Sequence, residues 1–241
     1  MIDQSKLENA SYELFIEGQL VNLCIPNISA IENDGWHTWF NKIADLQHTS
    51  HGIFPNTREN QELFLKNLDK KQNIVLLVCD KSDSSAVGVV SLNDIDLTFR
   101  QALFAINIGA PEKLAIPGLA ALEAVAMISE HGFKELGLNR IYGGQSYPGL
   151  KSWNKLLEII GYQVDGIERK AIRRGNNYYD KLEISLLYED YLKLVKHRGG
   201  LWPSVAEVHK ILKKQPSISF AEKLDNEMFQ AKKEHFKYLF E

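Results

Sequence analysis

Short apolar runs separated by turn-forming residues follow one another along most of the chain and predict β-strands. We predict strands in YELFIEGQLVNLCIP, NIVLLVCD, AVGVVSLNDID, ALFAINIG and NRIYGGQS. The second of these runs is apolar nearly throughout, which is typical of a strand covered on both faces. A later segment predicts a β-hairpin with its turn at Gly175 to Asn177, namely QVDGIERKAIRRGNNYYDKLEISLLY.

Helical spacing of apolar residues occurs between these strands. Two helices are predicted before NIVLLVCD, and Thr57 is the expected N-cap of the second. Their apolar faces consist of Trp36, Trp39, Phe40 and Ile43 in the first helix and of Leu63, Phe64 and Leu68 in the second. An alanine-rich helix follows the pair Pro117-Gly118 and is expected to end near Gly137. The last helix of this part has its stop at Gly161 and an apolar face of Trp153, Leu156, Leu157 and Ile160.

The pattern changes after about residue 188, where strand-like alternation ends. Two helical faces follow, one formed by Val205, Val208, Ile211 and Leu212 and the other by Leu224, Met228, Phe236, Leu239 and Phe240. The first face is preceded by Gly199, Gly200 and Pro203, which interrupt helical structure. The order of elements predicts an α/β (α+β) domain over residues 1–191 and a helical C-terminal extension over residues 192–241.

Composition limits the classes of function. The 241 residues suffice for one well-buried core, and a net charge of −3 gives no general electrostatic case for nucleic acid or an anionic membrane. The stretch MIDQSKLENASYELF lacks the features of a signal peptide, and no apolar run is long enough to span a bilayer. Cys24 and Cys79 lie in apolar runs without a CxxC partner, so we expect buried free thiols. These features predict a cytoplasmic protein without a nucleic-acid or membrane partner.

The order of predicted elements over residues 12–191 resembles that of the GNAT family of N-acetyltransferases. A helix end and the following strand of the RimJ/RimL-like branch are similar to FKELGLNRIYG. The Gly-aromatic pair, Gly turn and closing Ser-Leu-Leu of that branch are similar to IGYQVDGIERKAIRRGNNYYDKLEISLLYEDY, and a segment after its first helix is similar to HGIFPNT. The resemblance implies a mixed, mostly antiparallel central sheet flanked by helices and acetyl-CoA as co-substrate. His48 and His51 lie three residues apart, like a pair of metal ligands, but no third ligand is evident, so we expect no metal ion.

The phosphate loop of the family usually reads Arg/Gln-x-x-Gly-x-Gly/Ala, and its best match here is Ala115-x-x-Gly118-x-Ala120. In such a loop, main-chain N–H groups at a helix start bind the CoA pyrophosphate with help from the helix dipole. Ala115 replaces the basic or amide residue, Pro117 removes one N–H donor, and the alternative is that Gly118 only turns the chain. Charge would come instead from a nearby lysine: Lys113, Lys151 or Lys155. The resemblance implies CoA-binding residues at Asn107, Ile108, Ile116, Gly118, Leu119, Ala120 and Lys155.

The proton donor does not follow from the family pattern. The branch usually has Asn-x-x-Ser before its last long helix, and those two positions fall on Leu150 and Trp153. Tyr147 and Ser152 lie nearby and are candidates to protonate the CoA thiolate, although Tyr147 would equally pack on Trp153. His51 lies in a loop that the resemblance places over the acceptor. It is a candidate base or acceptor contact, and otherwise a surface histidine.

The main hypothesis is an N-acetyltransferase that acts on a small-molecule primary amine, with the amino group of a nucleotide-linked sugar in surface polysaccharide synthesis as first candidate. The hairpin residues suited to a sugar or a peptide are Asn177, Tyr178, Tyr179 and Asp180. The basic cluster ERKAIRR is either a solvated strand face or a phosphate contact. The alternatives are a protein N-terminal acetyltransferase and a GNAT-fold binding or assembly module that has lost its chemistry, in which the extension crosses the cleft or forms a homodimer.

Overall fold

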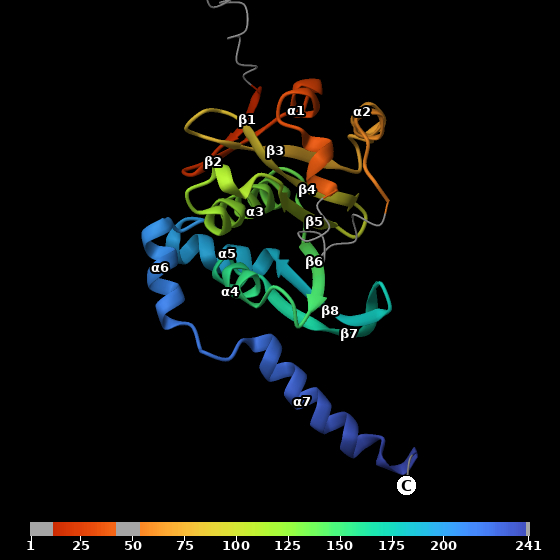
Figure 1. Ribbon diagram of the computed structural model, residues 1–241. Helices are drawn as coiled ribbons and strands as arrows, with labels where there is room; N and C mark the ends of the chain where they lie inside the picture. Colours follow the sequence, from red (N-terminus) through yellow and green to blue (C-terminus); the bar gives the residue numbers. More distant parts are fainter. Residues whose placement is uncertain (1–11, 42–53, 240–241) are drawn as a thin grey trace, which may run out of the picture.

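The computed structural model describes residues 12–41 and 54–239 (Figure 1). They form an eight-stranded sheet in the order β1-β2-β3-β4-β5-β6-β8-β7. Its strands are β1 (Leu14–Glu17), β2 (Val21–Cys24), β3 (Ile74–Asp80), β4 (Ala86–Asp96), β5 (Gln101–Ile108), β6 (Arg140–Tyr147), β7 (Gln163–Arg174) and β8 (Asn177–Leu187). All neighbouring pairs are antiparallel except β5 and β6, which run parallel. This confirms the predicted mixed, mostly antiparallel sheet.

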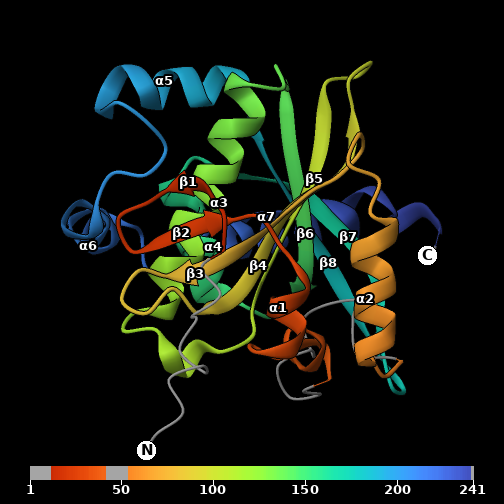
Figure 2. The ribbon, with the colours of Figure 1, turned by 90° about the horizontal axis from the view of Figure 1, so that it is seen from above.

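Helices cover both faces of this sheet (Figure 2). One face carries α1 (Ile28–Glu32), the 3₁₀ helix η2 (Trp36–Phe40) and α2 (Arg58–Asn67), and the other carries α3 (Pro117–Lys134) and α4 (Lys151–Ile159). The chain continues through α5 (Tyr188–Arg198), α6 (Val205–Lys214) and α7 (Phe220–His235), with short 3₁₀ turns η4 (Pro111–Lys113) and η5 (Lys237–Leu239). The α3 helix packs along β2, β4 and β5, so it lies at the centre of its face.

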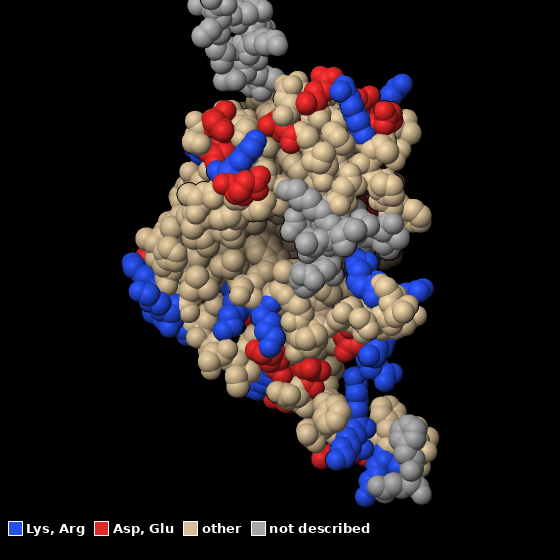
Figure 3. Space-filling model, viewed as in Figure 1, with Lys and Arg blue, Asp and Glu red and all other residues tan. Residues whose placement is uncertain are grey.

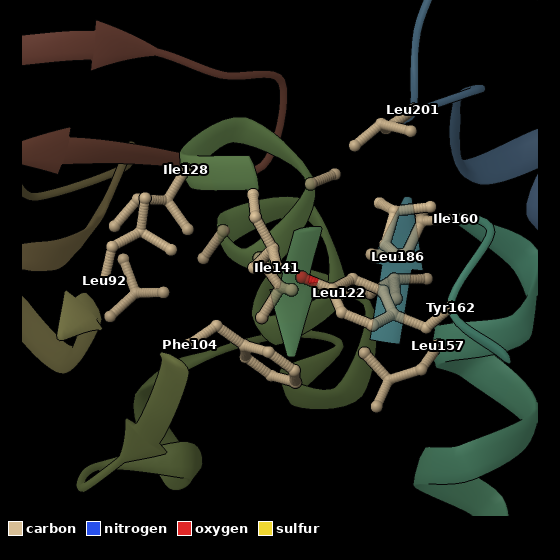
Figure 4. Close-up of a cluster of buried hydrophobic side chains, with 14 of the residues drawn as sticks. Leu92, Phe104, Leu122, Ile128, Ile141, Leu157, Ile160, Tyr162, Leu186 and Leu201 are labelled. Atoms are coloured by element: carbon tan, nitrogen blue, oxygen red, sulfur yellow. The ribbon is translucent and has the colours of Figure 1, made fainter. Parts of the chain in front are cut away.

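The larger core lies between the sheet and α3, because this helix is apolar on nearly every side. Side chains of the helix and strands meet there, among them Leu92, Leu122, Ile128 and Ile141 (Figure 4). Glu123 is the buried charged residue of α3. Its carboxylate accepts the backbone N–H groups of Gln19 (2.5 Å), Leu20 (2.6 Å) and Val21 (3.1 Å). These bonds satisfy the buried carboxylate and tie the β1–β2 turn to the helix.

A smaller apolar cluster lies on the opposite face, around Trp36 and Trp39. Cys24 of β2 and Cys79 of β3 belong to it and are both buried and unbridged, which confirms the prediction of free thiols. A Cβ atom on Gly109, directly after β5, would collide with the Trp39 ring. Because Gly109 has no side chain, the end of β5 can lie close to η2.

The first helical region differs from the prediction in two ways. The α1 helix, capped by Asn27, was not predicted, since a five-residue helix is too short to show a helical period. The first predicted helix is present as the 3₁₀ helix η2, and the predicted contact at Ile43 lies outside the described residues. The predicted apolar face of α2 is wrong at Leu63, which is 57% exposed, whereas the half-exposed Phe64 packs edge to face on Trp36 with ring centroids 6.2 Å apart. Gln61 is buried instead, and its side-chain amide oxygen accepts a hydrogen bond from Asn56 in the loop before the helix.

The C-terminal part is helical, as predicted, and it continues the larger core. Tyr191 of α5 stacks on Phe133 with ring centroids 5.1 Å apart, while Leu201 and Val208 are fully buried. The predicted boundary after residue 191 falls inside α5, and the division into two domains stays a prediction. By contrast, α7 projects from the body, with Phe220 and Phe229 exposed (Figure 1). Within the described residues, no helix combines the length and apolar character needed to cross a membrane.

Candidate active site

The parallel pair of β5 and β6 opens partway along its length. Its register consists of Gln101–Arg140, Ala102–Ile141 and Leu103–Tyr142. Both strands continue beyond this point, over 104–108 and 143–147, without pairing to each other. Phe104 fills the base of this V, since a Cβ atom on Gly143 would lie 2.5 Å from its ring. The ring is held there by Tyr162, with centroids 4.8 Å apart.

The start of α3 lies beside this V and next to α4. The space-filling view shows the molecule hollowed between α3 and α4, with uncharged walls (Figure 3). A Cβ atom on Gly118 would meet only Leu156 of α4, at the ordinary contact distance of 3.4 Å. The fold therefore does not require glycine at this position, and its φ angle is not in the left-handed region. A bare backbone at the helix start instead leaves room for a ligand to approach.

The first turn of α3 offers few free donors. The amides of Leu119 and Ala120 both donate to the carbonyl oxygen of Ile116, at 3.1 Å and 3.0 Å. Their side chains are buried, whereas Ile116 and Gly118 are exposed. No side chain caps this helix start and no acidic residue lies in its first turn. A phosphate here would be bound chiefly by main-chain N–H groups of Ile116 and Gly118, with the helix dipole.

The predicted residues on β5 lie where the V opens. Asn107 pairs with Val89 of β4, and Ile108 pairs with Gly88, so only the edge toward β6 lacks a strand partner. The Nδ2 atom of Asn107 is buried without a hydrogen-bond partner. Unpaired backbone on one strand edge is a template for an extended ligand.

The lysines near α4 contact the C-terminal part instead of the helix start. Lys155 donates to the carbonyl oxygens of Pro216 (3.2 Å) and Ser217 (3.0 Å), and Lys151 pairs with Glu222 of α7 at 2.6 Å. Lys151 and Ser219 together lower the pKa of Glu222 to about 2. Lys155 thus joins α4 to the connection from α6 to α7, and Lys151 joins α4 to α7 itself.

Tyr147 ends β6 and is buried in the larger core. Burial raises the pKa of Tyr147 to about 12, with help from Asp225 of α7. Asp225 acts through its negative charge and through a hydrogen bond with the phenol. Sequence reasoning missed Asp225, because nothing local links α7 to β6. Ser152 is exposed on α4, while the next polar residue, Asn154, is buried and accepts a hydrogen bond from Gln145. His51 lies outside the described residues.

The other wall of the V, on the face of α2, carries an ion pair that the sequence did not signal. A Cβ atom on Gly144 would lie 2.5 Å from Lys181 Cε and 3.3 Å from Glu183 Oε2. Lys181 and Glu183 pair with each other at 2.5 Å across this glycine. Among residues 12–41 and 54–239, no group of three His, Cys, Asp or Glu side chains could hold a metal ion.

No family model matches the chain. The probable N-acetyltransferase YjcK of Bacillus subtilis is 30% identical over 161 residues, which cover 66% of this chain and 84% of YjcK. Among solved structures, the spermidine N-acetyltransferase of Vibrio cholerae in complex with CoA and spermine matches 73% of this chain and 99% of its own, with a TM-score of 0.62 and 20% identity. A GNAT-family acetyltransferase of Bacillus anthracis matches the same shares with a TM-score of 0.60 and 21% identity.

The structural likenesses establish a common fold, including the mostly antiparallel sheet and its flanking helices. The likeness to YjcK adds sequence identity over most of that protein's length. Together with the V between β5 and β6, these findings show that the chain belongs to the GNAT family of N-acetyltransferases.

Proposed function

We propose that the protein transfers the acetyl group of acetyl-CoA to a primary amine, and that the amine belongs to a nucleotide-linked amino sugar. The observation that supports the transfer most is the open V between β5 and β6 beside the start of α3. At this helix start Gly118 is exposed and no side chain caps the backbone N–H groups. The residues fit a CoA molecule: the helix start would bind its pyrophosphate, and the free edge of β5 at Asn107 and Ile108 would bind its extended arm.

The reaction forms a bond between the acceptor nitrogen and the acetyl carbon and breaks the thioester bond. Backbone N–H groups on the free edge of β5 would stabilise the negative charge that develops on the acetyl oxygen. The proton lost by the amine would leave through water or a cleft side chain, and the departing thiolate would be protonated by a hydroxyl, for which Tyr147 is the candidate. Holding both substrates in line accounts for much of the expected rate.

The chemistry of the β7–β8 hairpin supports a nucleotide-linked acceptor. Its tip borders an open concavity of about 800 Å³ lined by Lys170, Asn176, Asn177, Tyr178 and Tyr179. Basic, amide and aromatic groups together suit an anionic molecule with a flat base. They suit a polycation such as the spermine of the Vibrio cholerae complex less well, because like charges repel.

A catalytically degenerate binding or assembly module is the second candidate, favoured by one observation. The C-terminal extension contacts both candidate lysines and the candidate proton donor. Ser217 and Glu222 bind the lysines, and Asp225 binds Tyr147. In that case the exposed apolar side of α7 would form a homodimer contact, and removing residues 218–241 would halve the mass in solution. An unchanged mass would contradict the dimer.

A screen of acceptors tests the proposal. The purified chain is mixed with acetyl-CoA and with UDP-linked amino sugars, N-terminal peptides or spermidine, and the release of free CoA thiol is followed. We expect turnover with the nucleotide-linked sugars. Turnover with peptides alone would identify a protein N-terminal acetyltransferase of the RimJ/RimL type. If the chain shows neither turnover nor saturable binding of acetyl-CoA, the remaining hypothesis is the catalytically degenerate binding module.

A further inference from the structure

The outer part of the β7–β8 hairpin concentrates unpaired positive charge. Its four cations are Arg169, Lys170, Arg173 and Arg174. Within the described residues none of the four forms an ion pair. By contrast, Lys181 at the inner end of β8 is paired, and so is Arg140 of the adjoining strand β6. In a chain of net charge −3, this cluster is a local exception. Clustered like charges without partners favour an anionic ligand.

The carboxylates near this cluster are already engaged. Asp180 accepts the backbone N–H of Lys170 at 2.8 Å, where β7 bulges. Glu168 and Glu183 lie 3.8 Å and 2.5 Å from the ammonium group of Lys181. They compensate the inner end of the hairpin and leave the four outer cations without a carboxylate partner. The guanidinium groups of Arg173 and Arg174 donate instead to the backbone carbonyl oxygens of Gly175 (3.0 Å) and Arg173 (3.2 Å).

The two neighbouring arginines point to opposite faces of the hairpin. Arg174 pairs in register with Asn177, and Arg173 pairs with Tyr178, so each arginine shares a face with its partner. Asn177 and Tyr179 alternate along β8 with Lys181 and Glu183, all on the face away from the α3 core. Arg174 therefore lies on the same face as the open wall of the V, and Arg173 lies on the other.

Arg174 also has an unsatisfied donor. One terminal nitrogen of its guanidinium group is buried without a hydrogen-bond partner, although the residue stands near a solvent-exposed hairpin tip. The exposed Tyr179 presents an aromatic ring on the same face. A guanidinium fork and an aromatic ring on one face of a hairpin match a diphosphate and a base.

The distance to the V suits one extended molecule. Gly144, on the wall of the V, pairs with Glu183 of β8. At about 3.4 Å per residue, β8 covers about 20 Å from Glu183 to Asn177. A ligand that reaches both places carries its amine at one end and its charge and base at the other, as a nucleoside diphosphate joined to an amino sugar does.

We propose that Lys170, Asn177 and Tyr179, which line the concavity at the hairpin tip, form a binding site for the nucleoside diphosphate of the acceptor together with Arg174, the register partner of Asn177. This inference rests on the proposed function for the identity of the acceptor, while the site itself binds a nucleoside diphosphate without any acetyl transfer. Of the two interpretations of the basic cluster, a solvated strand face or a phosphate contact, the proposal favours the phosphate contact.

The probe is UDP, titrated by calorimetry into the full chain in the presence of saturating CoA, so that the start of α3 is occupied. We expect saturable binding that Arg174→Ala weakens about tenfold or more, as loss of a charge-assisted contact does. The matched control is Arg173→Ala, which removes the same charge on the opposite face and is expected to weaken binding only about twofold. Tyr179→Ala is expected to weaken UDP binding and to leave inorganic pyrophosphate binding unchanged.

Two results would overturn the site. One is the absence of saturable UDP binding. The other is an equal loss of UDP affinity in the two arginine variants, which would indicate that only the overall positive charge of the hairpin attracts UDP. Tighter binding of a single-stranded RNA oligonucleotide than of UDP, lost equally in both variants, would identify a nucleic-acid surface instead. Binding of acetyl-CoA to each variant is measured separately. The wild-type chain could bind UDP, with a loss in Arg174→Ala, and yet fail to bind acetyl-CoA. That result would support the hairpin site and contradict the proposed acetyl transfer.

Discussion

Two regions of this molecule suit a phosphate group, and they do so by opposite means. The start of α3 offers main-chain N–H groups and a helix dipole, with no basic side chain in its first turn and Ala115 where the family usually has Arg or Gln. The tip of the β7–β8 hairpin offers side-chain cations without a helix start. The first depends on backbone geometry, which tolerates side-chain changes. The second depends on which face each side chain occupies, so truncating one side chain to alanine should weaken binding more at the hairpin than at the start of α3.

The largest expected effect separates binding from chemistry. Tyr147→Phe removes the candidate acid and leaves both phosphate regions intact, so kcat should fall by about 100-fold or more while acetyl-CoA and UDP affinities stay unchanged. Stopped-flow or steady-state thiol release measures the rate, and calorimetry measures the affinities. Unchanged kcat would remove Tyr147 from the mechanism.

The pH profile sharpens this test. Burial and Asp225 raise the pKa of Tyr147 to about 12, so the phenol keeps its proton at pH values where an ordinary tyrosine has lost it. The alkaline decline of kcat due to this group should therefore lie near pH 12 and move to lower pH in Asp225→Asn. An alkaline decline at the same pH in both proteins would assign it to another group.

At the start of α3, Gly118→Asp should weaken acetyl-CoA binding by about 100-fold, because a fixed negative charge would repel the pyrophosphate. The helix itself should be unharmed, since a Cβ at this position only touches Leu156 and a carboxylate suits a helix N-terminus. Thermal melting with and without ligand distinguishes the two effects. Gly118→Ala is the control, with a smaller loss; unchanged affinity in Gly118→Asp would exclude this loop as the phosphate site.

Restoring the family's basic residue gives a smaller effect of opposite sign. Ala115→Arg should tighten acetyl-CoA binding about tenfold by adding one charge-assisted hydrogen bond. Ala115 is exposed, so the substitution carries little structural cost. Ala115→Gln is the neutral comparison and should tighten binding less. Equal or weaker affinity in the arginine variant would show that this position does not face the phosphate.

The smallest effect is a difference in salt dependence. Raising the salt concentration from about 0.05 M to about 0.5 M should weaken UDP binding about fivefold, because exposed cations are screened. Acetyl-CoA binding should weaken less, about twofold, since main-chain donors carry more of it. Calorimetric titrations of both ligands in the same buffers measure the difference. An equal decline would contradict the contrast between the two regions.

Local signals in the sequence predicted much of the fold. Thr57 caps α2 through Asn60 N, Gly161 ends the region of α4 with a φ angle of +96°, and the hairpin turns at Gly175. Caps, stops and turns depend on the residues beside them, so a single chain segment determines them. The exposed Leu63 shows the limit, because burial depends on what packs against a helix as well as on its period.

The prediction at Gly118 depends on a local signal, a glycine next to a proline at a helix start. The structure gives this glycine no packing reason, and its role stays a prediction. By contrast, the contacts of Lys155 and Tyr147 with the tail join residues far apart in the chain, and no local pattern encodes them.

Local patterns in the chain were enough to predict the strands, most helices, the free thiols and the order of elements that resembles the GNAT family. The fold was needed to learn that β5 and β6 part after Leu103 and Tyr142, and that Arg173 and Arg174 face opposite ways. Pairing register and side-chain facing could not be predicted because they depend on which strands meet. Neighbouring residues of identical chemistry can therefore belong to different surfaces.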